Sequence, residues 1–531
     1  EFNQTNFSKI CVKDLLRTEK DKIMPRKYDY LTKSRITSGL QCHKKLWFDI
    51  HEPLKKIPKA VFEIGNRFGE QVIKNYSKDN GKVLDLTNVW INQVNKTKDA
   101  INSKDINIIF EGAFEYLNTQ VRVDVLIRKK NGWELLEAKS STKIKPEHIP
   151  DVSIQSFIVR TCLKELGHKL VGIKLIHVNK DFILEKKDDY EGLINDENDI
   201  TEEVIEEEVI NYIQELIPLS IKNSPTPNIK MGDHCNKPYS CDYQDRCSSL
   251  HPKSNVTPYT IIPYVTDNKE LKKYMENEAT MDLQKVPEKY LKKKRKGYAE
   301  NFPQIIQDAH KNNKDWFSKD LQNILEKFTF PYYFMDFETA MQGVPIIIGT
   351  KPYHPPLPFQ WSLHKWESFD KQVSPGKSFL KFNDQDIERQ FLVSLLDAVG
   401  NEGTIFAHSD YEIKVLNELK KKESCKDLTG KIDELIERIE NSLTIARENF
   451  YSPLMNGSWS IKSIIKAVPD SGISYEEEGG LAGGIDAGLA WFICTDPKTT
   501  KDEIEKQKKL LIDYCAKDTL AVYYFIKYLM K

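Results

Sequence analysis

Polar and hydrophobic residues alternate along three short runs in the first half of the chain, and this alternation predicts three consecutive β-strands. The runs are Ile108–Phe114, Val121–Arg128 and Trp133–Lys139, separated by polar turns such as Lys129–Gly132. Residues 145–166 follow with apolar positions at helical spacing. We therefore expect a strand meander that leads into an amphipathic helix.

The second half of the chain alternates strand patterns with helix patterns. The aromatic and apolar run Tyr332–Ala340 predicts a central strand. Two further strands are expected at Gly343–Gly349 and Gln360–Trp366, a helix at Asp386–Val399, a buried strand at Thr404–Ala407 that leads directly into a helix, and a last helix over residues 510–530. With the first half, this pattern predicts an α/β protein.

Two acids, Asp336 and Glu338, stand in the apolar run Tyr332–Ala340. Side chains alternate between the two faces of a strand, so both carboxylates point to one side while Met335 and Phe337 pack on the other. Like charges this close repel and are costly to bury, and one or two divalent cations between them relieve that cost. The pattern favours a metal site over its alternative, an edge strand with acids in water.

A second set of charged residues lies on the predicted meander. Asp124 stands among branched apolar residues, and Glu137 and Lys139 share one face of the next strand. Two acids can hold a divalent metal at a phosphodiester while a lysine orients or deprotonates water. Glu111 precedes this set, and Gln155 lies on the following helix. A solvated strand pair with a surface salt bridge is the alternative interpretation.

Three more candidate residues belong to helices of the second half. Glu412 falls in the first turn of the helix after Thr404–Ala407. In the last helix, Tyr514 and Asp518 are one turn apart and therefore share a face. Taken alone, Tyr514 and Asp518 could simply cap a packed helix.

Four cysteines suggest a bound inorganic group. Cys235, Cys241 and Cys247 are separated by five residues each, and the distant Cys42 is the best candidate for a fourth ligand. Four thiolates suit a 4Fe-4S cluster or a structural zinc ion. We favour the iron–sulfur cluster because this spacing is wide for a zinc knuckle. Unrelated free thiols are the remaining alternative.

Composition adds a limit on partners. The 531 residues suggest two to four domains, and 78 Lys and Arg against 79 Asp and Glu leave a net charge of −1. An anionic polymer would therefore need a local basic surface, such as the run Lys292–Lys296 between Tyr290 and Tyr298; a solvated linker helix explains that run equally well. No apolar run approaches a membrane span, so we expect a cytoplasmic protein without a membrane partner.

The first-half set resembles the PD-(D/E)XK nucleases of the RecB type. In that family the metal-binding Asp and the Glu-x-Lys lie on adjacent strands and a Gln sits on the next helix, which match Asp124, Glu137, Lys139 and Gln155. Many of these enzymes also carry an upstream histidine, but the corresponding stretch Gly65–Glu70 has none, and Glu70 is the candidate substitute.

The cysteine layout is similar to that of a RecB-type subgroup with an iron–sulfur clasp. That subgroup has one cysteine before the nuclease fold and three after it. The resemblance implies a 4Fe-4S cluster held by Cys42, Cys235, Cys241 and Cys247.

The second-half set resembles the DnaQ-like DEDD exonucleases of the ribonuclease H-like fold, in their tyrosine subtype. The resemblance implies that Asp336, Glu338, Glu412 and Asp518 bind Mg²⁺ or Mn²⁺ and that Tyr514 positions the attacking water. The third acid of that family is usually Asp, whereas Glu412 stands here, with Asp410 as its rival.

Together the two halves resemble a two-module bacterial family. We expect a PD-(D/E)XK restriction-endonuclease-like domain followed by a ribonuclease H-like α/β domain. The expected parts are an N-terminal extension at 1–30, the RecB-type domain at 31–252, a helical basic connector at 253–327 and the DnaQ-like domain at 328–531. The implied function is metal-dependent 3′–5′ exonuclease activity, on DNA rather than RNA, with a second site where Asp124 and Glu137 hold metal. A nucleic-acid-binding or assembly protein with degenerate sites is the alternative.

Overall fold

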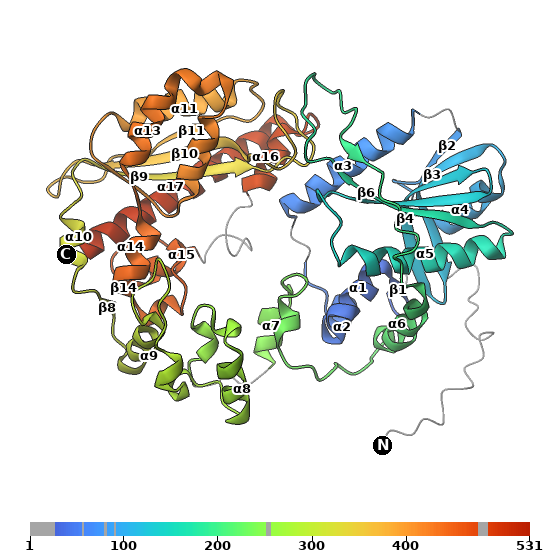
Figure 1. Cartoon of the computed structure of the whole chain (residues 1–531), viewed down its shortest axis with the longest axis horizontal. Helices are drawn as coiled ribbons and strands as arrows, with labels where there is room; N and C mark the ends of the chain where they lie inside the picture. The colour runs from blue at the N-terminus through green and yellow to red at the C-terminus, as the bar shows by residue number, and fades with distance from the viewer. Residues whose placement is uncertain (1–26, 56–57, 79–81, 90–91, 251–255, 476–486) are drawn as a thin grey trace. The chain divides into compact units, whose positions relative to one another are not determined.

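The computed structural model describes residues 27–55, 58–78, 82–89, 92–250, 256–475 and 487–531, which form two compact units (Figure 1). The first unit contains 64–182 and 189–252 together with the preceding residues up to 57, and the second contains 58–63, 183–188 and 253–531. Both units combine helices with a mixed sheet, which confirms the predicted α/β class. Among the helices of the described residues, none has the length and apolar character to cross a bilayer.

The first unit is built on a seven-stranded sheet. Its strands are β1 (Leu31–Thr32), β2 (Lys82–Asp85), β3 (Ile106–Tyr116), β4 (Thr119–Lys129), β5 (Gly132–Lys139), β6 (Leu170–Val178) and β7 (Ile194–Asn195), in the order β2-β3-β4-β5-β6-β7 with β1 beside β4. Strands β3, β4 and β5 are antiparallel neighbours, which confirms the predicted meander. The following helix α5 (His148–Glu165) is also confirmed, and it leads into β6, which pairs parallel to β5.

Helices from both ends of this unit share one core with the sheet. The helices of the unit are α1 (Lys33–Gln41), α2 (His43–His51), α3 (Ala60–Tyr76), α4 (Gln93–Asn102), α5, α6 (Val209–Leu216) and α7 (Gln244–Ser249). Ile36 of α1, Leu46 of α2 and Ile213 of α6 are buried in the cluster that contains Val123 of β4 and Ile158 of α5. Residues near both ends of the unit are thereby held beside its central strands.

The second unit is built on a five-stranded sheet in the order β11-β10-β9-β12-β13. Its strands are β9 (Tyr332–Ala340), β10 (Leu357–Trp366), β11 (Lys377–Leu380), β12 (Thr404–Ala407) and β13 (Ile439–Asn441), with β8 (Trp316–Phe317) and β14 (Phe450–Tyr451) in a separate pair. Strand β9 runs antiparallel to β10 and parallel to β12. The predictions of a central strand at β9 and of strands at β10 and β12 are confirmed.

Helices cover both faces of this sheet. They are α8 (Lys269–Asn277), α9 (Phe302–Asn312), α10 (Leu321–Leu325), α11 (Ile387–Val399), α12 (Tyr411–Leu419), α13 (Thr429–Glu437), α14 (Ser442–Asn449), α15 (Ile461–Ile464), α16 (Ala487–Thr495) and α17 (Lys501–Leu529). Met335 and Phe337 pack against α11, α12 and α13, whereas Phe334 packs in the cluster that contains α17. Figure 1 shows α11 and α13 on one side of β9 and β10 and α17 on the other.

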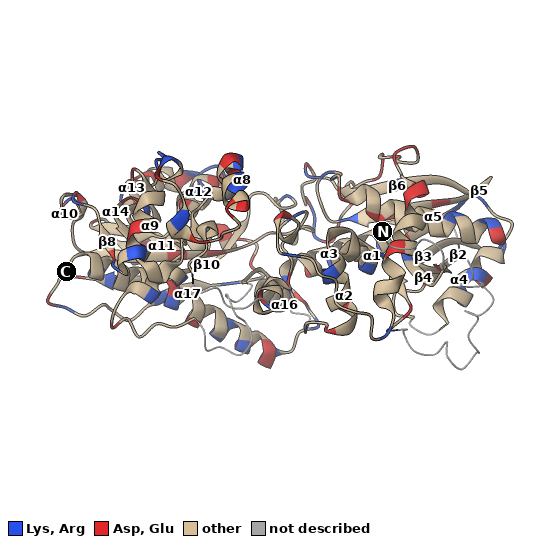
Figure 2. Ribbon diagram, turned by 90° about the horizontal axis from the view of Figure 1, so that it is seen from below, with Lys and Arg blue, Asp and Glu red and all other residues tan. Residues whose placement is uncertain are grey.

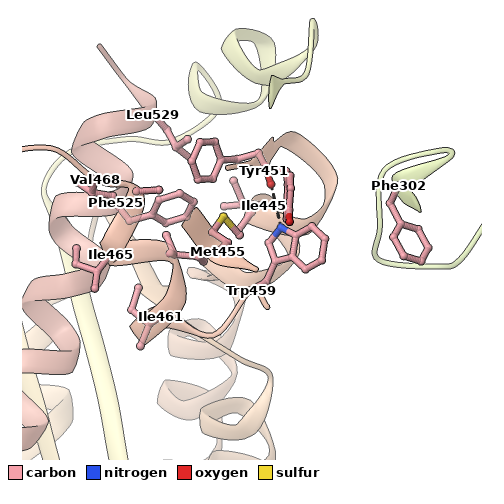
Figure 3. Packing of buried hydrophobic residues seen from close by; sticks show 14 of the residues in the cluster. Phe302, Ile445, Tyr451, Met455, Trp459, Ile461, Ile465, Val468, Phe525 and Leu529 are labelled. Atoms are coloured by element: carbon pink, nitrogen blue, oxygen red, sulfur yellow. Dashed lines mark hydrogen bonds between the residues drawn. The ribbon is translucent and has the colours of Figure 1, made fainter. Parts of the chain in front are cut away.

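The larger core of the second unit gathers segments distant in sequence (Figure 3). Its buried members include Phe302 of α9, Tyr451 of β14, Trp459 in the loop before α15, and Phe525 of α17. Leu271 and Leu283, which fall in the expected connector 253–327, are buried in the same cluster. These residues are therefore part of a folded core.

Two predicted elements are absent from the described residues. Gly343–Gly349 forms turns instead of a strand, although Val344 and Ile347 are buried. The Gln342 side chain there accepts a hydrogen bond from the Ile346 amide (2.8 Å), so an irregular loop buries the apolar residues. Within the helical connector expected at 253–327, residues 278–301 between α8 and α9 form short 3₁₀ turns and irregular chain instead of a helix. Pro287 and the adjacent like charges disfavour a helix there.

Candidate metal centres

Strand β9 places two acids beneath the last helix. Asp336 pairs with Ser362 and Glu338 with Gln360 on β10, so these side chains share one face of the sheet. That face is covered by α17, because Gln360 Nε2 donates to the Leu511 carbonyl (2.9 Å). The opposite face carries Met335 and Phe337, as the alternation predicted. The same alternation that builds the core thus directs both carboxylates to α17.

Helix α17 adds three groups to this pair. One carboxylate oxygen each from Asp336 and Glu338 and the sulfur of Cys515 lie within 4.8 Å of one another, which makes them a possible metal-binding group. The Cys515 thiol donates to Asp336 Oδ2 (3.2 Å). Tyr514 is hydrogen-bonded to Asp518 one turn later. The charge of Asp518 raises the pKa of Asp336, and Asp336 and Glu338 contribute to the raised pKa of Tyr514. The structure therefore brings Asp336, Glu338, Tyr514 and Asp518 together.

The third acid comes from the turn between β12 and α12. Glu412 is buried and accepts a hydrogen bond from Ser409 Oγ (3.1 Å), and its charge raises the pKa of Asp336. Its rival Asp410 is exposed and accepts a hydrogen bond from Asn441 Nδ2 (2.7 Å). Burial and electrostatic coupling place Glu412, and not Asp410, in the acidic group.

Burial and mutual repulsion dominate the electrostatics of this group. The pKa of Asp336 is raised well above its usual range by burial and then by Glu338, Asp518 and Glu412. Burial also raises the pKa of Glu412 to about 7 and raises that of Asp518, which hydrogen bonds from Tyr475 and Tyr514 partly offset. Ionising these four acids together is costly, and a divalent cation bound between them would offset that cost. We call them the acidic centre.

Tyr475 and Cys515 were missed by sequence reasoning. Tyr475 Oη donates to Asp518 Oδ1 (2.5 Å), and the aromatic ring lies 5.4 Å from Lys462 Nζ. Tyr475 lies outside every predicted helix and strand, so its contact with Asp518 could not be predicted from the sequence. Cys515 adjoins Tyr514, but a lone cysteine in an apolar helix is typical of a core residue.

In the first unit, two of the predicted acids face each other. Val125 pairs with Leu136 on antiparallel β4 and β5, so the next residues along, Asp124 and Glu137, are opposite one another. Asp124 Oδ2 accepts a hydrogen bond from the Ala138 amide (2.7 Å). Gln155 Nε2 of α5 donates to Glu137 Oε2 (2.7 Å). The four predicted positions of this set, including Lys139, therefore meet.

Two lysines bind Glu137 in this centre. Lys139 Nζ and Lys33 Nζ each lie 2.7 Å from Glu137 Oε1, and both also contact Asp151. Lys33 begins α1, 104 residues before Glu137, and one sequence offers no signal for so distant a contact. Asp151 lies in the first turn of α5 and was not among the predicted site residues. We call Lys33, Asp124, Glu137, Lys139 and Asp151 the lysine–acid network.

The two lysines reverse the effect of burial on Glu137. Burial alone would raise the pKa of Glu137, but Lys139 and Lys33 outweigh it and hold that pKa far below its usual range. Asp124 behaves oppositely: burial and the charge of Glu137 raise its pKa well above normal. The network therefore contains one strongly ionised acid and one that resists ionisation. Glu70 of α3, the proposed histidine substitute, is exposed.

Replacing Lys33 by alanine should destabilise the first unit. Glu137 and Asp151 would lose one of their two cationic partners in a buried site, and breaking a buried pair costs roughly 3–5 kcal/mol. Urea unfolding should show this loss, whereas Lys130→Ala, in the exposed β4–β5 turn, should stay within about 0.5 kcal/mol of wild type. Equal stability of the two variants would contradict the importance of the Lys33 contacts.

The four predicted cysteines line one pocket of the first unit. Cys42 lies between α1 and α2, Cys235 and Cys241 lie in the loop before α7, and Cys247 lies on α7. Burial raises the thiol pKa values of Cys241 and Cys247, and the neighbouring cysteines of the group raise them further. The Cys241 amide donates to the Cys235 carbonyl (2.8 Å), which folds the loop around the pocket. All four sulfurs are free thiols that face a shared space.

The fold thus defines a mixed α/β protein with two charged centres and a four-cysteine pocket. A family profile described as a domain of unknown function, DUF2779, matches residues 333–460. The match spans most of β9 to β13, and it contains Asp336, Glu338 and Glu412 but stops before Tyr514 and Asp518. A search of curated proteins found no matching protein.

Proposed function

We propose that the chain is a metal-dependent nuclease whose main site is the acidic centre. The observation that supports this most directly is the convergence of Asp336, Glu338, Glu412 and Asp518 from β9, α12 and α17 on one buried group. Acids gathered at this cost are typical of sites that bind divalent cations for phosphodiester hydrolysis. DNA is the substrate we favour over RNA, with cleavage from a 3′ end.

The sheet order supports the proposed ribonuclease H-like fold. Numbered along the sequence, the five strands of the second sheet lie in the order 3-2-1-4-5, with the first three antiparallel and the last two parallel to the first. The D-x-E strand is therefore central, and the third acid follows its parallel neighbour β12. In the first unit, the antiparallel strands β3 to β5, helix α5 and parallel β6 support the PD-(D/E)XK proposal in the same way.

The donor set of the acidic centre fits a divalent cation. Asp336, Glu338, Glu412 and Asp518 would hold Mg²⁺ or Mn²⁺, which lowers the pKa of bound water and stabilises the leaving oxygen when bound. Gln360 Oε1 lies on the same face and is buried without a hydrogen-bond partner among the described residues. That acceptor would suit a metal-bound water.

Each residue around the metal has a distinct task in this proposal. Asp336, Glu338 and Asp518 would hold the metal ions, and Glu412 would support them from α12. Tyr475 and Tyr514 hold the Asp518 carboxylate in place by hydrogen bonds. Burial and the charge of Asp518 raise the pKa of Tyr514, so its hydroxyl stays protonated and donates to Asp518. Its oxygen can then accept a hydrogen bond from the attacking water.

The four-cysteine pocket favours a cluster over zinc in this proposal. A tetrahedral zinc ion with sulfurs at about 2.3 Å would hold them about 3.8 Å apart. No three of these four sulfurs, all of them described, lie within 4.8 Å of one another. A 4Fe-4S cluster is larger than one ion and suits that wider arrangement. We propose that it joins the first helices of the unit to its last.

A specific observation favours a second role for the first unit. Glu137 already receives hydrogen bonds from Lys33, Lys139 and Gln155, and its charge is neutralised by the two lysines. Metal binding by Glu137 and Asp124 would have to displace a lysine. In this second candidate, the first unit binds nucleic acid or assists assembly, and cleavage takes place at the acidic centre alone.

The test compares metal-dependent digestion of labelled DNA and RNA by two single variants. If both centres cleave, Asp336→Asn removes 3′ exonuclease activity and Asp124→Asn removes a separate activity. If the first unit only binds, Asp124→Asn leaves cleavage intact. A double variant that digests both polymers as well as wild type would contradict the proposed function.

The acidic centre should make metal-free stability fall with rising pH. Glu412 ionises near its ordinary 4.5 in the unfolded chain but near 7 when folded, so between these values the folded protein keeps a proton that the unfolded chain has lost. Stability should therefore decrease from pH 5 to 7, by about 2 kcal/mol from this residue. Calorimetry with and without Mn²⁺ checks this, since metal should stabilise more at pH 8 than at pH 5.5.

Glu412→Gln is the control for this pH dependence. The amide keeps the size of the side chain but cannot ionise, so much of the slope between pH 5 and 7 should disappear. An unchanged slope in the variant would show that another group causes it.

A further inference from the structure

The densest basic segment of the chain is a rigid part of the second unit. Leu291 and Phe302, which flank residues 292–301, are each 1% exposed and belong to the unit's core. The Asn301 amide donates to the Lys293 carbonyl (3.2 Å), so the segment closes on itself as a loop. Lys294, Arg295 and Lys296 between them are exposed. Their backbone is held by the core while their charges face solvent.

Aromatic rings fix the guanidinium groups at this loop. The Arg295 guanidinium lies 3.3 Å from the centroid of the Tyr264 ring, and that of Arg447 lies 4.8 Å from the Tyr298 ring. The two tyrosine rings meet edge to face at 6.2 Å. A stacked guanidinium still donates hydrogen bonds in its own plane, which suits a phosphate oxygen. Arg295 is thus ordered for recognition before any ligand binds.

Most of the positive charge at this loop is not neutralised. Lys294 pairs with Glu300 at 2.7 Å, but both side chains are largely exposed, so the pair contributes little. Lys294, Arg295, Lys296, Tyr298 and Glu300 line one surface pocket, with three positive charges against one negative. An anion that entered the pocket would meet a local excess of positive charge on a protein whose net charge is −1.

A short chain of contacts connects this loop to the acidic centre. Tyr298 packs edge to face against Trp459, with ring centroids 5.5 Å apart. The Trp459 carbonyl is hydrogen-bonded to His408 Nε2 (3.0 Å), and Ser409, next in sequence, donates to Glu412. The loop and the third acid are therefore connected through one buried tryptophan within the same unit.

We propose that Lys294, Arg295 and Lys296, ordered by Tyr264 and Tyr298, form a binding surface for the phosphate backbone of single-stranded nucleic acid. We call this surface the basic platform. A strand on the platform would extend toward Glu412 and place its 3′ end at the acidic centre. This inference rests on the proposed function and adds to it the surface of the second unit that holds the backbone of the substrate. Fixed cations around one pocket suit successive phosphates better than the diffuse charge of a lipid surface.

Binding and cleavage by a triple variant, Lys294→Ala with Arg295→Ala and Lys296→Ala, test the platform. The full chain is titrated with an oligonucleotide of about 20 nucleotides, with divalent metal chelated to prevent cleavage. The variant should bind at least tenfold more weakly at about 0.1 M salt, and the slope of log affinity against log salt should fall by about 2, since each lost phosphate contact removes about 0.7. Hydrolysis of the p-nitrophenyl ester of thymidine 5′-monophosphate should be unchanged.

The matched control removes three other lysines of the same unit. Lys420, Lys421 and Lys422 follow α12, and Lys420 is eight residues, or about 12 Å of helix, beyond Glu412. Their replacement by alanine changes the net charge equally but should leave oligonucleotide affinity near that of wild type. The three platform positions and Lys421 are exposed, whereas Lys420 and Lys422 are partly buried and pair with Asp433 and Glu388. Circular dichroism therefore checks that both triple variants remain folded.

Two results would overturn the platform. One is equal weakening by the platform variant and the control; the other is unchanged oligonucleotide affinity with loss of binding only to vesicles that contain anionic lipid. A wild-type protein that hydrolyses neither substrate, yet shows the predicted binding difference, would count against the proposed function while supporting the platform.

Discussion

Asp336→Ala is expected to reduce metal-dependent nuclease activity at least a thousandfold. This carboxylate is central to the acidic centre, because its pKa is raised by burial and then by Glu338, Asp518 and Glu412 together. Its loss should weaken metal binding, and a thousandfold decrease corresponds to about 4 kcal/mol of transition-state stabilisation. Initial rates on a 3′-labelled oligonucleotide in Mn²⁺ measure the effect.

The loss should not result from unfolding. Removal of a buried acid that repels three others should leave the metal-free protein as stable as wild type or more stable, and thermal unfolding with metal chelated checks this. Asp336→Asn, which keeps the shape, should be equally inactive. The exposed Asp410, two residues from Glu412, provides the control: Asp410→Ala should retain activity within about twofold. Comparable losses in the Asp410 and Asp336 variants would contradict the assignment of the centre.

Cys247→Ala is expected to remove the bound cluster and unfold the first unit. The four cysteines come from α1–α2 and from the region of α7, so the group they bind would join the two ends of that unit. Binding of a structural metal group contributes directly to folding, on the order of 10 kcal/mol in small metal-dependent domains. We expect loss of brown colour, loss of absorbance in the blue, and loss of the first of two thermal transitions.

Cys162→Ala is the matched control for this experiment. Cys162 is a buried free thiol of the same unit, but it lies on α5 outside the four-cysteine pocket. Its replacement should keep the colour and cost no more than a small core truncation, about 1 kcal/mol. A Cys247→Ala protein that keeps both colour and first transition would show that the four thiols hold no common group.

Alternation along single strands predicted much of the fold. It located the meander β3 to β5, whereas continuous apolar runs located β9, β10 and β12, which are buried on both faces. It failed at Gly343–Gly349, where Val344 and Ile347 are buried in a loop held by the Gln342 side chain. Burial of apolar residues is readable from sequence, but a loop can also bury them.

In the candidate centres, contacts between residues close in sequence could be predicted, whereas contacts between distant residues could not. Asp336 and Glu338, or Glu137 and Lys139, are two residues apart, so strand geometry alone sets them on one face. Lys33 reaches Glu137 across 104 residues, and only the packing of α1 beside the sheet makes that contact. The choice between Asp410 and Glu412 also needed the structure, since burial distinguishes two acids in the same helical turn.

Digestion of a 5′-labelled single-stranded oligonucleotide by the wild-type protein in Mn²⁺ tests the central claim most directly. The label stays on the shrinking product, so 3′–5′ hydrolysis at the acidic centre should give a ladder that shortens one nucleotide at a time. Chelation of the metal or Asp336→Asn should abolish the ladder. No metal-dependent shortening by the wild type, or an unchanged ladder with Asp336→Asn, would contradict the account.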